Sequence, residues 1–169
     1  MSAPVVLLGS GNVAAALALA LRPHRPVRVW ARRPEAAVGL AAATDASPSD
    51  HGVTAHVDLT EALAGEVHAV LFAVSDGALA ALASQLAELP PGLLADTVCM
   101  HLSGYHGTGV LAPLALPACL HPNAAVTVGA GPGVFRGAHF GIGGEGEALE
   151  RARDLALELG GKPLVVADE

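Results

Sequence analysis

The chain has 169 residues and a formal net charge of −7, with 52% hydrophobic and 15% charged residues. This length suits one domain with a real hydrophobic core. The negative charge, with no basic stripe, argues against a nucleic-acid partner. Residues 3–21 are uncharged, yet no basic start precedes them and a Gly-Ser-Gly-Asn turn interrupts them. We therefore expect neither a signal peptide nor a membrane helix, and we predict a cytoplasmic location.

The first predicted unit is a strand, a glycine turn and a helix. The apolar run of residues 5–8 leads through Gly9-Ser10-Gly11-Asn12-Val13-Ala14 into an Ala/Leu stretch that ends before Pro23. In a Gly-x-Gly-x-x-Gly/Ala pattern, the first glycine permits a tight turn, and the second lets a pyrophosphate approach the backbone. The small third residue lets the helix pack close to the strand. We predict that Gly9, Ser10, Gly11, Asn12 and Val13 bind a dinucleotide, and a purely structural turn is the alternative.

Strands and helices alternate along the rest of the chain. We predict strands at residues 27–31, 53–57, 68–74, 97–102, 118–121, 138–142 and 163–167. We predict helices at residues 34–43, from 61, from 75 or 76 to about 89, and at 145–159. Asp58 or Thr60 is expected to cap the short helix, and Ser75 or Asp76 the longer one. Apolar strands alternating with helices predict an α/β fold of Rossmann type, a doubly wound, mostly parallel sheet with helices on both faces.

The end of the second predicted strand bears on the choice of nucleotide. In this fold an acidic residue there binds the 2′-hydroxyl of NAD. Here the strand runs into Arg32 and Arg33, and the first acid is Glu35. Guanidinium groups form forked, charged hydrogen bonds with a phosphate. We therefore predict that Arg32 and Arg33 bind the 2′-phosphate of NADP, with NAD less favoured. A pair of solvated arginines is the alternative.

Small and polar residues follow the later strands, where they are expected to line the cofactor crevice. We predict cofactor contacts from Ala73, Val74, Ser75, Ser103 and Gly104. A plain helix cap explains Ser75 equally well.

Taken together, four motifs resemble a known family: residues 9–14, 73–76, 101–104 and His121-Pro122. They are similar to uncharacterised Rossmann-like NADP-binding proteins of the 6-phosphogluconate dehydrogenase-like superfamily, and residues 122–131 are similar to pyrroline-5-carboxylate reductase. The resemblance implies hydride transfer between NADPH and a small carbonyl or imine substrate. It also implies a helical C-terminal domain that completes the substrate pocket and commonly builds a homodimer.

The resemblance sets the expected domain organisation. We interpret residues 1–169 as the NADP-binding domain alone, in a truncated or naturally short form, because the chain stops where the linker to the helical domain is expected to begin. A homodimer is then expected mainly when that domain is present.

Reduction of a carbonyl or imine also needs a proton donor. Relatives often use a lysine of the helical domain, whereas Lys162, the single lysine, is expected at the wrong edge of the sheet. We predict His101, His121 and Ser103 as catalytic candidates, because histidine titrates near neutral pH and serine can hydrogen-bond substrate. The alternative is that the histidines satisfy backbone groups or contact the missing domain. No metal site is predicted. An NADP(H)-responsive regulatory module without catalysis is the alternative function.

Overall fold

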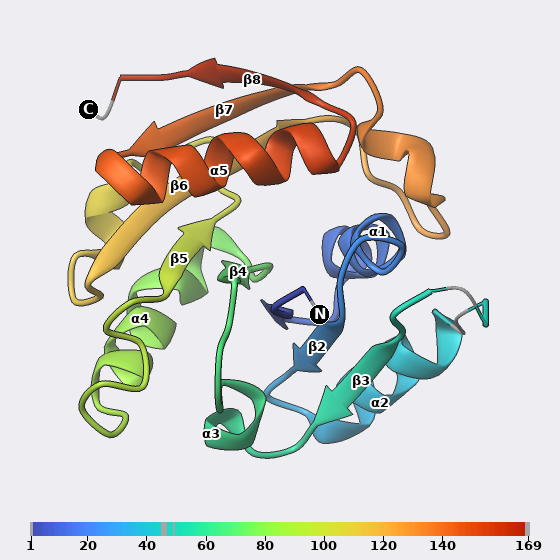
Figure 1. Ribbon diagram of the computed structural model, residues 1–169, viewed down its shortest axis with the longest axis horizontal. Helices are drawn as coiled ribbons and strands as arrows, with labels where there is room; N and C mark the ends of the chain where they lie inside the picture. Colours follow the sequence, from blue (N-terminus) through green and yellow to red (C-terminus); the bar gives the residue numbers. More distant parts are fainter. Residues whose placement is uncertain (1, 45–46, 49, 168–169) are drawn as a thin grey trace.

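The computed structural model describes residues 2–44, 47–48 and 50–167. Its sheet has eight strands in the order β3-β2-β1-β4-β5-β6-β7-β8 (Figure 1). Every neighbouring pair is parallel except β6 and β7. This confirms the predicted mostly parallel sheet. The strands are β1 Val5–Leu8, β2 Val27–Trp30, β3 Val53–His56, β4 Ala69–Phe72, β5 Val98–His101, β6 Leu116–Asn123, β7 His139–Gly144 and β8 Lys162–Val165.

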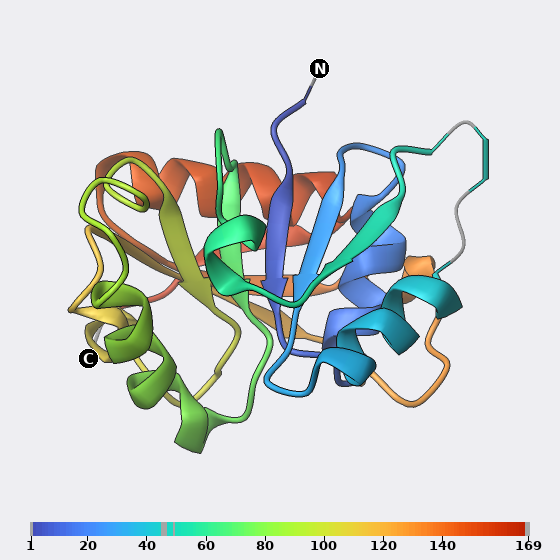
Figure 2. The same ribbon diagram turned by 90° about the horizontal axis from the view of Figure 1, so that it is seen from below.

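Helices lie on both faces of the sheet. They are α1 Asn12–Leu21, α2 Pro34–Ala43, α3 Leu59–Ala62, α4 Leu79–Ala87 and α5 Gly146–Glu158, with short 3₁₀ turns η1 Asp76–Ala78, η2 Thr108–Leu111 and η3 Pro132–Phe135. The helices α1, α2 and α5 share one apolar core with the sheet, and α3 and α4 share the other. The twisted sheet wraps around α1 and α5 in Figure 1, while α3 and α4 lie on its outer side, as the rotated view in Figure 2 also shows.

One helix cap and two of the turns differ from what the sequence predicts. The Asp58 carboxylate accepts a hydrogen bond from the Glu61 amide at 3.0 Å, so Asp58 rather than Thr60 caps α3. The expected cap of the next helix is wrong. Neither Ser75 nor Asp76 caps it with a side chain, because the chain first forms η1 and the helix α4 begins only at Leu79. The turns η2 and η3 lie between the predicted strands, where no helix was expected.

Strand register brings the predicted site loops to one edge. Leu8 at the end of β1 pairs with Trp30 of β2 and with Phe72 of β4. Phe72 pairs in turn with His101 at the end of β5. The segments that follow these strands carry the glycine turn, the two arginines and the two small-residue loops. All of them therefore emerge at the carboxyl edge of the parallel strands, where such folds bind ligands.

The strand β7 runs antiparallel to β6, and this sets the direction of β8 as well. Lys162 pairs with His139, which pairs with Asn123 at the carboxyl end of β6. Lys162 therefore lies at the carboxyl edge, and its expected position at the opposite edge is wrong, because β7 runs antiparallel to β6 and β8 follows the direction of β7. Helix α5 packs on one face of β6 and β7. In Figure 1 no helix of the described chain lies on the outer side of β7 and β8.

Candidate functional site

Gly9, just after β1, lies directly against the backbone of Ala73, just after β4. Its φ is +126°, and a Cβ there would lie 2.1 Å from the carbonyl oxygen of Ala73. The Gly9 amide donates to the Trp30 carbonyl and the Ala73 amide donates to the Leu8 carbonyl, each at 2.8 Å. Only glycine adopts this conformation without strain and leaves room for Ala73. The predicted tight turn at Gly9 therefore also fixes the neighbouring loop.

Gly11 has the opposite surroundings. It is the N-cap of α1 with φ −78°, no side chain caps the helix, and a Cβ at Gly11 would meet no protein atom within 4 Å. The first N–H groups of a helix have no intrahelical partner, and the positive end of the helix dipole attracts anions. Ala14 is fully buried in the core beneath. The space above Gly11 thus fits a phosphate group, and nothing inside the protein demands a glycine there.

A cavity of about 560 Å³ unites these elements at the carboxyl edge. Among the predicted cofactor residues, those that line it are Gly9, Ser10, Gly11, Arg32, Arg33, Ala73, Val74 and Ser75. Asn12 and Val13 begin α1 beside it, whereas Ser103 and Gly104 line a different cavity.

The two arginines of this cavity are free to bind a ligand. Arg32 and Arg33 are both exposed, and neither guanidinium group forms a hydrogen bond or ion pair within the described residues. Arg33 is also the N-cap residue of α2 and makes no side-chain cap. Two guanidinium groups beside a helix N-terminus form a cationic corner, which suits a phosphate dianion.

Sequence reasoning missed the wall of this cavity that α4 provides. Ala78, the N-cap residue of α4, and Leu82 and Gln85 of α4 line the cavity, together with Ala36 of α2. The three residues recur at the spacing of one helix face, so the signal was present in the helix that follows β4. Their mixture of apolar carbons and one amide is suited to a flat heterocycle such as adenine.

The loop after β5 is held by its own polar groups. The Ser103 hydroxyl oxygen accepts from the Tyr105 and His106 amides, at 3.0 and 3.2 Å. The Ser103 amide donates to His101 Nδ1 at 3.2 Å, so His101 Nε2 carries the proton and donates to the Gly107 carbonyl at 3.1 Å. His101 is fully buried. Both ring nitrogens of His101 therefore position this loop.

His121 lies beside this loop and occupies the space that Gly104 leaves. Its Nδ1 donates to the Leu102 carbonyl at 2.9 Å. A Cβ on Gly104 would lie 2.6 Å from His121 Nε2, so Gly104 makes room for the imidazole ring. With Nδ1 protonated, the neutral ring presents Nε2 as an acceptor, and the imidazolium presents it as a donor. Ser103, Gly104 and His121 line a second cavity of about 420 Å³.

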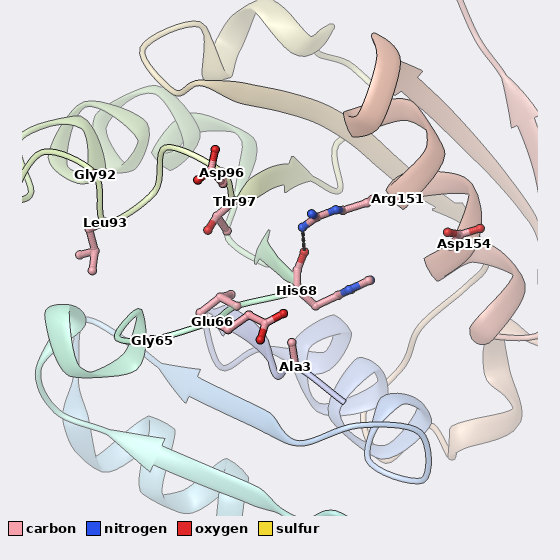
Figure 3. Close-up of a pocket in the computed structure, with 11 residues that line it drawn as sticks. Ala3, Gly65, Glu66, His68, Gly92, Leu93, Asp96, Thr97, Arg151 and Asp154 are labelled. Atoms are coloured by element: carbon pink, nitrogen blue, oxygen red, sulfur yellow. Dashed lines mark hydrogen bonds between the residues drawn. The ribbon is translucent and has the colours of Figure 1, made fainter. Parts of the chain in front are cut away.

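A third cavity, of about 540 Å³, lies at the opposite, amino edge of the sheet and contains none of the predicted site residues (Figure 3). Arg151 of α5 donates to the His68 carbonyl at 2.8 Å and pairs with Glu147. His68 Nε2 is buried without a hydrogen-bond partner. Burial, followed by the charges of Arg25 and Arg151, lowers the pKa of His68 below 6.5. These surroundings therefore favour the neutral form of His68.

The described residues contain no group of three or more His, Cys, Asp or Glu side chains arranged to hold a metal ion. None of the helices in that part of the chain is long and apolar enough to cross a membrane.

Fold and site together define a doubly wound α/β domain of the Rossmann type, with its main crevice at the carboxyl ends of the strands. No protein-family model matches the chain. No curated protein matches it either.

Solved structures of dehydrogenases and reductases do match. The chain is similar to Mycobacterium tuberculosis 3-hydroxyisobutyrate dehydrogenase, with TM-score 0.74 and 24% identity over 99% of this chain and 55% of that one. It is similar to a reductive aminase from Aspergillus terreus in complex with NADPH, with TM-score 0.69 and 20% identity over 99% and 56%. Synechocystis arogenate dehydrogenase gives TM-score 0.77 and 14% identity over 97% and 59%. These likenesses establish the fold, and the chain spans little more than half of each structure.

Proposed function

We propose that this chain binds NADP(H) at the carboxyl edge of its sheet and serves an oxidoreductase that transfers hydride between NADPH and a small carbonyl or imine. One observation carries the proposal. A single cavity of about 560 Å³ joins the open space over Gly11, the N-terminus of α1 and the unpaired Arg32 and Arg33. Three of the solved structures that share the fold are named as a 3-hydroxyisobutyrate dehydrogenase, an imine reductase and a reductive aminase.

Each part of the cavity has a distinct role in this proposal. The backbone from Gly9 to Val13 holds the pyrophosphate, because unpaired amides and the helix dipole favour anions. Arg32 and Arg33 hold the 2′-phosphate. The end of β2 carries no carboxylate that would favour the unphosphorylated ribose of NAD, since the first acidic residue after the strand is Glu35. The face of α4 that carries Leu82 and Gln85 lies against the adenine.

The cofactor, when bound, supplies a hydride to the carbon of the carbonyl or imine. His121 supplies the proton to the oxygen or nitrogen from Nε2, because its Nδ1 is tied to the Leu102 carbonyl. Ser103 donates its hydroxyl hydrogen to substrate or to the cofactor carboxamide, since its oxygen already accepts two amides. His101 is a positioning residue that holds the Ser103 loop.

A regulatory module that responds to NADP(H) is the second candidate. It is favoured because all three predicted catalytic side chains form hydrogen bonds with the backbone. Both ring nitrogens of His101 form hydrogen bonds with backbone groups, and the Ser103 hydroxyl oxygen accepts hydrogen bonds from two amides. Among the three residues, His121 therefore remains as the proton donor. In this alternative, cofactor binding rather than turnover is the output of the domain.

Calorimetric titration with NADPH and with NADH tests cofactor binding. We expect NADPH to bind more tightly, and the Arg32→Ala/Arg33→Ala double variant to weaken NADPH binding roughly ten- to a hundredfold, since charge-assisted hydrogen bonds to the 2′-phosphate are lost. NADH binding should change little. Arg136→Ala, which removes an exposed arginine outside the cavity, is the matched control. Failure to bind either dinucleotide would show that the glycine turn is only architectural.

NADPH oxidation with a panel of ketones and imines, measured on a longer form of the protein that carries the expected helical domain, separates the two candidate functions, because that domain is expected to complete the substrate pocket. An enzyme should turn over at least one compound, and His121→Gln should remove turnover while NADPH still binds. Tight NADPH binding without turnover on any compound would favour the regulatory module.

A further inference from the structure

The cavity beside His121 lies next to the turn η2, on the face of β6 and β7 that α5 does not cover. Its volume of about 420 Å³ falls within the range of small-ligand pockets. Gly141 and Gly143 occupy alternate positions on β7, so they face the same side and form its floor. The floor is therefore bare backbone, bordered by His121 on β6 and by Val166 after β8.

The protein itself does not require these two glycines. Neither has a positive φ. A Cβ on Gly141 would meet Val166 Cγ1 at 3.4 Å, and one on Gly143 would meet the Cys119 Cβ at 3.6 Å, both ordinary contacts. Gly161 differs, because a Cβ there would lie 2.4 Å from the Phe140 ring. Alanine would fit at Gly141 and Gly143 with ordinary contacts to neighbouring side chains, and its methyl group would take up part of the cavity.

Tyr105 lies at the rim of the same cavity, and most of its side chain is exposed to solvent. Its side chain is 83% exposed, and the ring meets His106 edge to face at 5.1 Å and 85°. The Tyr105 amide donates to the Ser103 hydroxyl at 3.0 Å, which fixes the Tyr105 backbone at the rim of the cavity. A large aromatic ring gains free energy when another ring covers it. This ring is thus placed to stack on a ligand.

We propose that this cavity binds a planar ring of the substrate, which makes aromatic or conjugated ketones and imines the substrate class. The ring lies on the Gly141 and Gly143 floor and stacks with Tyr105, and the adjoining carbonyl or imine faces His121 Nε2. The carbon receives the hydride and the oxygen or nitrogen receives the His121 proton, giving an alcohol or amine. This inference rests on the proposed function and names the substrate class for it.

The test compares acetophenone with cyclohexyl methyl ketone, its saturated counterpart, by NMR titration without cofactor. Acetophenone should bind about fivefold more tightly, as expected for one aromatic contact. Gly143→Ala should weaken acetophenone binding about tenfold, because its methyl group occupies the floor. Tyr105→Leu should abolish the preference between the ketones, whereas Tyr105→Phe should keep it. Gly133→Ala, in an open position of η3, is the control that should change nothing.

Equal affinity for the two ketones would overturn the inference, as would acetophenone binding that is unchanged in a folded Gly143→Ala variant. Thermal melting of each variant checks that it folds. Failure of the proposed function looks different. NADPH would then not bind, while the preference for acetophenone, measured without cofactor, would persist.

Discussion

Adding one methyl group at Gly9 and at Gly11 should have opposite consequences, although both glycines belong to the same turn. In Gly9→Ala the new carbon would lie 2.1 Å from the Ala73 oxygen at a φ of +126°. The backbone strain alone costs about 1–3 kcal/mol, and the overlap forces β1 and β4 apart. We expect a loss of at least about 3 kcal/mol in the free energy of unfolding, which is a melting temperature lower by roughly 6–12 °C.

In Gly11→Ala the methyl group meets no protein atom within 4 Å. Alanine restricts the unfolded chain, which stabilises by about 0.4–1 kcal/mol, and it is a poorer N-cap than glycine, which offsets part of this gain. We expect the free energy of unfolding to change by less than about 1 kcal/mol. NADPH binding should weaken about a hundredfold, because the methyl group occupies the phosphate space and about two charge-assisted hydrogen bonds are lost.

Urea denaturation and calorimetric titration of both variants measure these two effects separately. Gly133→Ala is the control, since its added carbon also meets open space but lies away from the cavity. The reasoning would be refuted if Gly11→Ala bound NADPH like the wild type, or if Gly9→Ala unfolded at the wild-type urea concentration.

Three further predictions concern buried groups. Because the folded pKa of His68 lies below 6.5, the unfolded chain binds the extra proton, so the free energy of unfolding should fall as pH drops below about 6.5; in urea titrations the wild type should lose stability relative to His68→Phe over this range, and a pH-independent difference between the two would contradict this. Glu158→Gln should destabilise by about 2–3 kcal/mol, since it leaves the mostly buried Arg25 without its carboxylate, and a loss below about 0.5 kcal/mol in thermal melts would contradict that. Burial raises the pKa of Cys99 to about 12, so iodoacetamide at pH 8 should modify it only after unfolding, as mass spectrometry of the native and denatured protein can show.

Sequence patterns predicted the parallel half of the fold well, because each strand and helix there carries its own local signal. The residues from Val5 to Ala14 specify strand, turn and helix without help from distant parts of the chain. The reversal of β7 was not predictable in the same way. An apolar run such as residues 138–142 looks alike in either direction, and pairing with β6 decides its orientation. Lys162 was misplaced for that reason.

In the candidate site, too, features with a local sequence signal could be predicted, whereas features set by tertiary packing could not. The glycine turn and the two arginines could be predicted as candidates because each has a characteristic residue type at a characteristic place, and the structure brings them to one cavity. The α4 wall was missed because Leu82 and Gln85 are ordinary helix residues whose role depends on tertiary packing. The tie between His121 Nδ1 and the Leu102 carbonyl joins two strands, so no local pattern reveals it.

Two contacts of α5 bear on how the molecule can move. Arg25, just before β2, pairs through two hydrogen bonds with Glu158 and also donates to the Ala3 carbonyl before β1. Arg151 donates to the His68 carbonyl before β4. Both contacts bind α5, which packs on β6 and β7, to the amino edge of the central strands. Motion of α5 relative to β1, β2 and β4 is therefore restrained at this edge, opposite the edge at which we propose that the dinucleotide binds.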